Sequence, residues 1–180
     1  MADHPQPAVD RMVEPVGHAI VAGVAPGQDE LVPLTAVAWA RAVRAPMVHF
    51  AYADVSRYAV EEHPDGTVTH APIDPDTADV DWQQTAAGLR SHLERVLAGA
   101  DVPWRFVYLA GRPDRALTHL ARAVDAAAIV VGTRAPGGAG RLREAIEGSV
   151  AVHLAQHQHR PVLTVPLSVV DWKETRAPWQ

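Results

Sequence analysis

Five short apolar runs alternate along the chain with longer segments that have helical periodicity. A short run that is apolar throughout is typical of a strand buried on both faces of a sheet. The runs cover residues 19–24, 47–52, 104–110, 127–131 and 161–165. Strands that alternate with helices favour a parallel sheet covered on both faces, with right-handed crossovers. The pattern therefore predicts an α/β fold with an open five-stranded parallel sheet, doubly wound.

Four helices are expected between and after these runs. The first covers residues 30–44, with Pro33 in its first turn, where proline is tolerated, and Pro46 just beyond its end. The second covers residues 82–98, and the third follows the turn at residues 111–113. Apolar positions spaced by three or four residues predict their buried faces. These positions are Leu89, Leu93, Val96 and Leu97 in the second helix, and Leu117, Leu120, Ala121 and Val124 in the third. A last helix is expected over residues 142–157.

The rest of the chain is less regular. Prolines and charges break any periodicity in residues 1–17, which we expect to form a loose arm before a domain of residues 18–166. The segment 54–81 has room for a short hairpin around Val60 and Val68, but its pattern does not require one, and a loop this long is often functional or mobile. A tail of residues 167–180 contains Trp172 and Trp179, and tryptophans in a tail more often pack locally than bind a ligand.

Composition excludes several classes of function. The net charge of -5, from 16 Lys and Arg against 21 Asp and Glu, argues against a nucleic-acid partner, because phosphate backbones are held by clustered positive charge. The absence of cysteine excludes disulfides, thiolate metal sites and thiol catalysis. No apolar run approaches the roughly 18 residues that a membrane span needs, and the first segment does not resemble a secretory signal. We therefore expect a cytoplasmic protein with no membrane partner.

The loop after the fourth predicted strand is the first candidate for chemistry. In parallel sheets, ligands bind beyond the carboxyl ends of the strands where the strand order reverses. Residues 132–140 there contain four glycines, and Arg134, Arg141 and Arg143 lie in or just after the loop. Glycines let backbone N–H groups approach an anion, and a following helix adds the positive end of its dipole. The loop fits a phosphate site, and it equally fits a flexible connection between strand and helix.

Three segments at the end of the domain carry a resemblance. Val130–Arg134, Glu147–Ala151 and Arg160–Pro166 together resemble the ending of universal stress proteins, whose nucleotide-binding members carry Gly-x2-Gly-x9-Gly-Ser/Thr. The resemblance implies a flavodoxin-like, or adenine nucleotide alpha hydrolase-like, fold. It also implies a homodimer formed through the last strand, Val162–Val165, and a role in stress signalling without catalysis.

The same resemblance implies ATP or another adenine nucleotide as ligand, with Mg²⁺. Phosphates would be held by Gly132, Gly138, Gly148 and Ser149, with Thr133 and Arg134 beside them and with Val24 and Ala25 at the end of the first strand.

Two departures from the family pattern bear on that ligand. Members that hold ATP usually have an aspartate just after the first strand, where this chain has Ala25, and the glycine loop is three residues longer than the motif. Loss of one buried hydrogen bond is worth about 1 kcal/mol, or roughly tenfold in affinity. The alternative is therefore a family member that has lost ATP binding and acts as a dimeric protein-interaction module.

No constellation of enzyme residues is apparent. His153 and His157 have the spacing of a two-histidine metal pair, but no third ligand accompanies them, and histidines near a helix end also complement its dipole. Ser149 lies one turn before His153 but lacks the Gly-x-Ser-x-Gly turn of a hydrolase. A slow ATP hydrolase remains a third hypothesis, for which the sequence offers no group that would position water.

Overall fold

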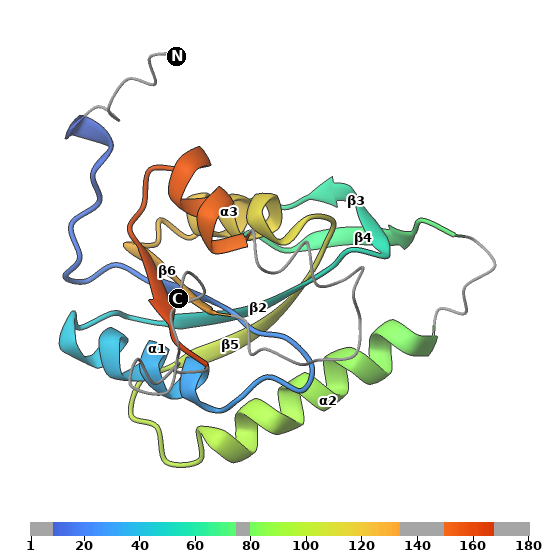
Figure 1. Ribbon diagram of the computed structural model, residues 1–180, viewed down its shortest axis with the longest axis horizontal. Helices are drawn as coiled ribbons and strands as arrows, with labels where there is room; N and C mark the ends of the chain where they lie inside the picture. The colour runs from blue at the N-terminus through green and yellow to red at the C-terminus, as the bar shows by residue number, and fades with distance from the viewer. Residues whose placement is uncertain (1–8, 75–79, 134–149, 168–180) are drawn as a thin grey trace, which may run out of the picture.

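The computed structural model describes residues 9–74, 80–133 and 150–167 (Figure 1). Five strands form one sheet in the order β5-β2-β1-β6-β7, and every neighbouring pair is parallel. The strands are β1 (Ile20–Gly23), β2 (Val48–Asp54), β5 (Trp104–Ala110), β6 (Ala128–Gly132) and β7 (Val162–Val165). The predicted open, parallel, five-stranded sheet is therefore confirmed.

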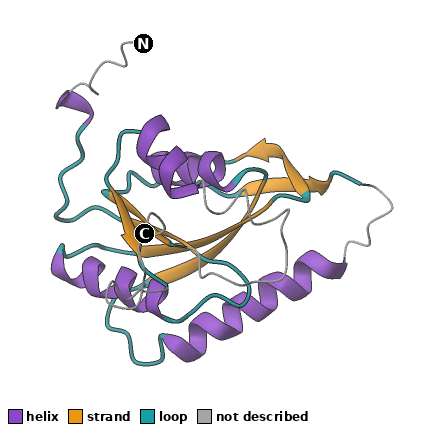
Figure 2. Cartoon of the chain, viewed as in Figure 1, coloured by secondary structure: helices purple, strands orange, loops and turns teal. Residues whose placement is uncertain are grey.

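Helices cover both faces of this sheet (Figure 2). Helices α1 (Leu31–Ala42) and α2 (Val80–Val96) pack on one face. Helix α3 (Pro113–Ala123) and the helical residues 150–157 pack on the other. The first three predicted helices are confirmed, and Pro33 lies in the first turn of α1 as expected. Of the fourth, predicted over 142–157, only residues 150–157 lie within the described part of the chain.

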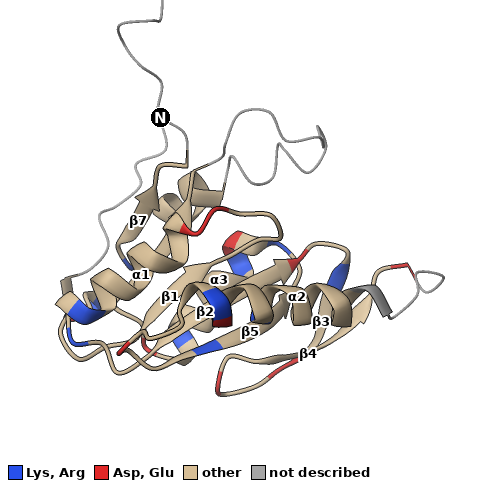
Figure 3. Cartoon of the chain, turned by 90° about the horizontal axis from the view of Figure 1, so that it is seen from below, with Lys and Arg blue, Asp and Glu red and all other residues tan. Residues whose placement is uncertain are grey.

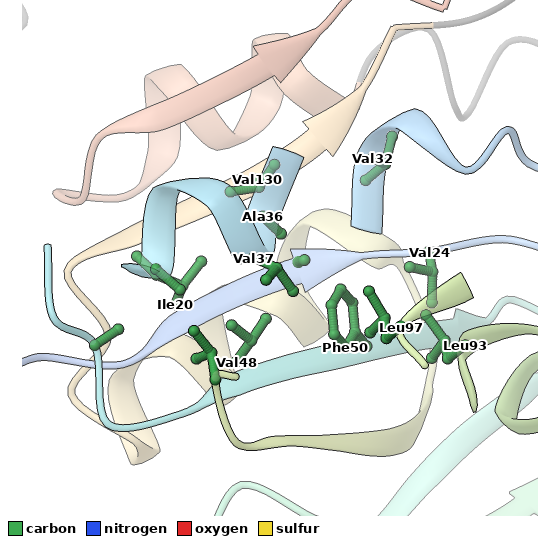
Figure 4. Close-up of a cluster of buried hydrophobic side chains, with 14 of the residues drawn as sticks. Ile20, Val24, Val32, Ala36, Val37, Val48, Phe50, Leu93, Leu97 and Val130 are labelled. Atoms are coloured by element: carbon green, nitrogen blue, oxygen red, sulfur yellow. The ribbon is translucent and has the colours of Figure 1, made fainter. Parts of the chain in front are cut away.

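The apolar runs become strands because each buries side chains on both faces. In β1, Ile20 points into a core formed with α1 and α2, where Phe50 and Leu93 are fully buried (Figure 4). The next residue, Val21, belongs to a second core on the opposite face, formed with α3 and Leu154. A fully buried side chain of this kind stabilises the fold by about 1.5–3 kcal/mol.

Part of the segment 54–81 forms an antiparallel hairpin of β3 (Arg57–Glu62) and β4 (Val68–Pro72). The hairpin that the sequence left open around Val60 and Val68 is therefore present. Five of the six residues of β3 are exposed, so the strand lacks the apolar run by which the sheet strands were recognised. A bulge between Ala59 and Glu61 further disturbs its alternation.

The described end of the N-terminal arm is partly ordered against the domain. A short 3-10 helix covers Val9–Arg11, and Arg11 Nη1 lies 2.8 Å from His159 Nε2. Val13 packs on the first core, whereas Val9, Met12 and Val16 are exposed.

Candidate functional site

The sheet reverses its direction of winding between β1 and β6. The two strands are parallel neighbours, yet β1 leads to α1 on one face, while the residues after β6 lead to helical residues 150–157 on the other. Numbered along the chain, the strand order of the sheet is 3-2-1-4-5, which puts the reversal between its first and fourth strands. Flavodoxin itself, with the order 2-1-3-4-5, reverses between its first and third. The carboxyl ends of β1 and β6 therefore mark the position, called the crevice below, at which a ligand is expected.

Four of the predicted site residues lie at this crevice. Val24 follows β1, is buried, and donates its N–H to the carbonyl of Ala51 at 2.9 Å. Ala25 comes next, and Gly132 and Thr133 lie at the end of β6. Pairing Ile20 with Ala128 sets the register that brings these two strand ends together. The other four predicted site residues are outside the described residues: Arg134, Gly138, Gly148 and Ser149.

Gly132 lies close to three side chains that meet at the end of β6. A Cβ atom at this position would lie 2.8 Å from Gln28 Nε2, 2.8 Å from Leu167 Cδ1 and 3.0 Å from Val32 Cγ2. A Cβ here would force the ends of the Gln28 and Leu167 side chains to move, so glycine allows the turn after β1 and the segment after β7 to approach the end of β6 closely. The chain's own side chains occupy the part of the crevice next to Gly132.

The side chain of Gln28 is a polar group of the crevice that the sequence analysis missed. Its Oε1 accepts a hydrogen bond from the N–H of Ala25 at 3.3 Å, and its backbone N–H donates to the Ala25 carbonyl at 3.2 Å. Pro26 and Gly27 mark a turn after the first strand in the sequence, and the residue that closes such a turn could have been found from that signal. Gln28 places a carboxamide beside Ala25, where the resemblance led us to look for a carboxylate.

Thr133 ties the end of β6 to the residues after β7. Its N–H donates to the carbonyl of Val165 at 2.7 Å, and its Oγ1 accepts the N–H of Leu167 at 2.8 Å. The hydroxyl keeps its own proton to donate, because it accepts in this contact. Thr133 thus holds the segment after β7 in place, and its hydroxyl proton is still available to donate to a ligand.

A buried polar cluster occupies the same edge of the sheet, at the ends of β2 and β5. Asp54 Oδ2 accepts the hydroxyl of Tyr108 at 2.5 Å, and Asp54 Oδ1 accepts the Ser56 N–H and hydroxyl at 2.8 and 2.6 Å. Burial alone would raise the pKa of Asp54, but the hydrogen bonds from Ser56 and Tyr108 and the charge of Arg57 outweigh it and hold the pKa below its usual value. Burial, together with the bond to Asp54, raises the pKa of Tyr108. Asp54 is therefore a carboxylate and Tyr108 a phenol at neutral pH.

The hairpin is anchored to this cluster. Arg57 is buried and donates from Nε to His70 Nδ1 at 2.8 Å, and its guanidinium carbon lies 5.6 Å from the ring centre of Trp82. The ring centres of His70 and Tyr108 are 5.3 Å apart. A cation–aromatic contact and packed rings of this kind hold the base of the hairpin on β5 and α2.

The histidine pair on the last helix shows no metal-like arrangement. His157 Nδ1 lies 3.0 Å from the backbone carbonyl of His153, and the two ring centres are 5.7 Å apart. Within residues 9–74, 80–133 and 150–167, no three His, Cys, Asp or Glu side chains gather as metal ligands would.

Comparison with known proteins now decides the family. The model of the universal stress protein family matches residues 34–166, more than half of the chain. The chain belongs to the universal stress protein family. Among curated proteins, none is similar enough in sequence to count as a match.

Solved universal stress proteins share the fold. A structure from Archaeoglobus fulgidus is 22% identical, covers 83% of this chain and 94% of its own, and has a TM-score of 0.57. A universal stress protein in complex with cAMP is 25% identical, covers 85% of this chain and 99% of its own, and has a TM-score of 0.55. The Archaeoglobus fulgidus protein in complex with dAMP is 22% identical, covers 83% and 98%, and has a TM-score of 0.52.

The surface of this universal stress protein carries both signs of charge. Figure 3 shows Arg positions as well as Asp and Glu positions on the helices and loops in view. Among the residues described, no helix combines the length and the hydrophobicity that crossing a membrane requires.

Proposed function

We propose that this universal stress protein binds an adenine nucleotide in the crevice between β1 and β6 and signals through that binding, as a cytoplasmic homodimer without catalysis. The observation that carries the proposal is the carboxamide of Gln28 between Ala25 and Gly132, at the reversal of the sheet. A family member that is 25% identical is in complex with cAMP, which supports an adenine nucleotide as the class of ligand.

Gln28 has the chemistry to replace the acid that the first strand lacks. A glutamine amide offers one donor and one acceptor, and these match the N6 amino group and N7 of adenine. To pair with a base, the amide gives up its 3.3 Å contact with the Ala25 N–H, which is at the long end of the hydrogen-bond range. The phosphate side of the proposed site rests on Gly132, Thr133, Arg134, Gly138, Gly148 and Ser149. Mg²⁺ would accompany a triphosphate.

The nucleotide proposal is tested by thermal unfolding with cAMP, AMP and Mg-ATP at millimolar concentration. Ligand at about a hundred times its dissociation constant adds about 2.7 kcal/mol of stability, which is a readily measured rise in melting temperature. Gln28→Ala should lower the affinity for adenine nucleotides roughly tenfold, because the contact of Gln28 with the base is lost. Gln84→Ala, an exposed position on α2, serves as the matched control and should leave affinity unchanged.

The competing function is a dimeric interaction module that has lost nucleotide binding. Its specific support is Ala25 in place of the expected acid, together with the filling of the space beside Gly132 by Gln28 and Leu167. If none of the three nucleotides raises the melting temperature, and the Gln28 and Gln84 variants behave alike, the interaction module is the better assignment. Release of phosphate from Mg-ATP above the buffer rate would instead establish a hydrolase.

A further inference from the structure

A cavity of about 310 Å³ lies between the β3–β4 hairpin and α3. None of the described residues of the proposed nucleotide site lines it, and β2 separates β5, whose end forms one wall, from β1. Small-molecule sites span about 300–1,000 Å³, so this cavity has the size for a small metabolite.

The walls are apolar in the middle and charged toward the ends. Ala59, Val68, Leu109 and Ala116 supply the apolar surface. The start of α3 contributes its N-cap residue Arg112 and the helical residues Arg115, Ala116 and His119. Arg115, Ala116 and His119 are spaced by one, three or four positions and share one face of the helix. Arg115 and His119 are one turn apart, about 6 Å along the helix axis.

Two arginines lie at one end, and only Arg112 has a partner among the described residues. Arg112 binds Asp114 through two contacts, Nε to Oδ1 at 3.1 Å and Nη2 to Oδ2 at 2.9 Å. Arg115 is exposed and has no side-chain hydrogen bond or ion pair with any residue in the described part of the chain. A guanidinium that lines a cavity and is not already paired is a ready partner for a carboxylate.

The opposite end pairs an acid with a histidine. Glu62 Oε2 lies 3.1 Å from His119 Nδ1, and because a carboxylate only accepts, Nδ1 must carry a proton. In the neutral ring Nε2 then has a free lone pair, and it is buried with no hydrogen-bond partner among the described residues. His119 Nε2 is closed to solvent, so the acceptor that a donating ligand group can reach at this end is the exposed carboxylate of Glu62.

We propose that this cavity binds a small carboxylate whose apolar body ends in a hydrogen-bond donor, a hydroxyl or an amine. The carboxylate pairs with Arg115, the body lies on the apolar middle, and the donor meets Glu62, which is paired with His119 one helical turn away. The hairpin makes the site, because it supplies Glu62 and one apolar wall.

The test is an amide NMR titration of the full chain with three matched probes. 4-Hydroxyphenylacetate carries both end groups, phenylacetate lacks the donor, and 2-(4-hydroxyphenyl)ethanol lacks the carboxylate. The first should shift the amides of Gly111, Ala116 and His119 at millimolar concentration, with each truncated probe roughly tenfold weaker or more. Arg115→Gln should lower the affinity for 4-hydroxyphenylacetate to a similar extent. Arg122→Gln, exposed on the same helix and outside the cavity, should not.

The proposal is overturned if none of the lining amides shift, if the three probes bind equally, or if Arg115→Gln binds 4-hydroxyphenylacetate as well as the parent does. An unchanged amide spectrum of the free variant shows that a loss of binding is not a loss of fold. The result is independent of the nucleotide site, because cAMP titrated in parallel reports on Gly132 and Thr133 and not on this cavity.

Discussion

His49 shows how one buried residue makes stability depend on pH. Its Nδ1 accepts a hydrogen bond from Arg105 Nε at 2.7 Å, and because a guanidinium only donates, Nδ1 must be unprotonated. Burial, followed by the charge of Arg105, lowers the pKa of His49 from 6.5 to about 4, against the opposing charge of Asp65. Below pH 6.5 the unfolded chain binds a proton at His49, whereas the folded chain does not until about pH 4.

The free energy of unfolding should therefore fall as the pH drops from 6.5 to about 4, by at most about 3 kcal/mol from this residue. His49→Gln keeps an acceptor for Arg105 but cannot titrate, so it should lose that part of the fall. Urea denaturation across this range measures the difference. His157→Gln, an exposed position, should keep the full dependence, and an equal effect of both substitutions would refute the assignment to His49.

Some residues of the candidate site could be predicted from the sequence and others could not. Gly132 and Thr133 were found because a strand followed by glycines is a local pattern. Gln28 was not, because its role comes from the pairing of β1 with β6, which brings residues more than 100 positions apart into contact. The same holds for Asp54 and Tyr108, whose bond joins two strands across the sheet.

At the scale of elements, the hairpin is held at its tip as well as at its base. Arg105 Nη2 donates to the backbone carbonyl of Asp65 at 2.7 Å. Gly66 follows with a φ of +82°, and a Cβ there would lie 2.5 Å from Leu120 Cδ1 and 3.2 Å from Ala123 Cβ. The tip thus lies on α3 in a conformation that favours glycine.

Gly66→Ala should destabilise the protein for two reasons, the left-handed backbone and the clash with Leu120. The backbone part alone costs about 1–2 kcal/mol, and overpacking of this kind adds about 1–3 kcal/mol. Gly99→Ala is the matched control, since Gly99 has a φ of +86° but nothing within 4 Å of its would-be Cβ. Chemical denaturation should show the larger loss for Gly66→Ala; equal losses would mean that the tip does not pack on α3.

Elements were predictable to the extent that they bury apolar side chains in a periodic pattern. The five sheet strands and the first three helices follow from apolar periodicity, because the two cores require it. The hairpin gave a weak signal because Tyr58 and Val60 are half or more exposed, so β3 is held by contacts at its ends and not by an apolar face. Elements that depend on a few long-range polar contacts have no periodic signature.

At the scale of the whole molecule, β7 leaves one edge of the sheet open. It pairs only with β6 among the residues that the structure describes. The carbonyls of Pro161 and Val165 accept from Ile129 and Thr133 of the β6 segment, and alternate residues of a strand direct their backbone groups to the same side. Val162 and Thr164 therefore direct theirs outward, and an apolar edge strand of this kind needs covering.

The proposed homodimer through β7 makes a sharp prediction at Thr164. Thr164→Pro removes the outward N–H but no bond to β6, and proline is tolerated on an edge strand. The parent should sediment as a dimer and the proline variant as a folded monomer, while Thr164→Val, which keeps the N–H, should remain a dimer. Sedimentation velocity with circular dichroism measures both properties. A proline variant that is still dimeric would show that the copies associate through another surface, and a monomeric parent would remove the dimer from the proposed function.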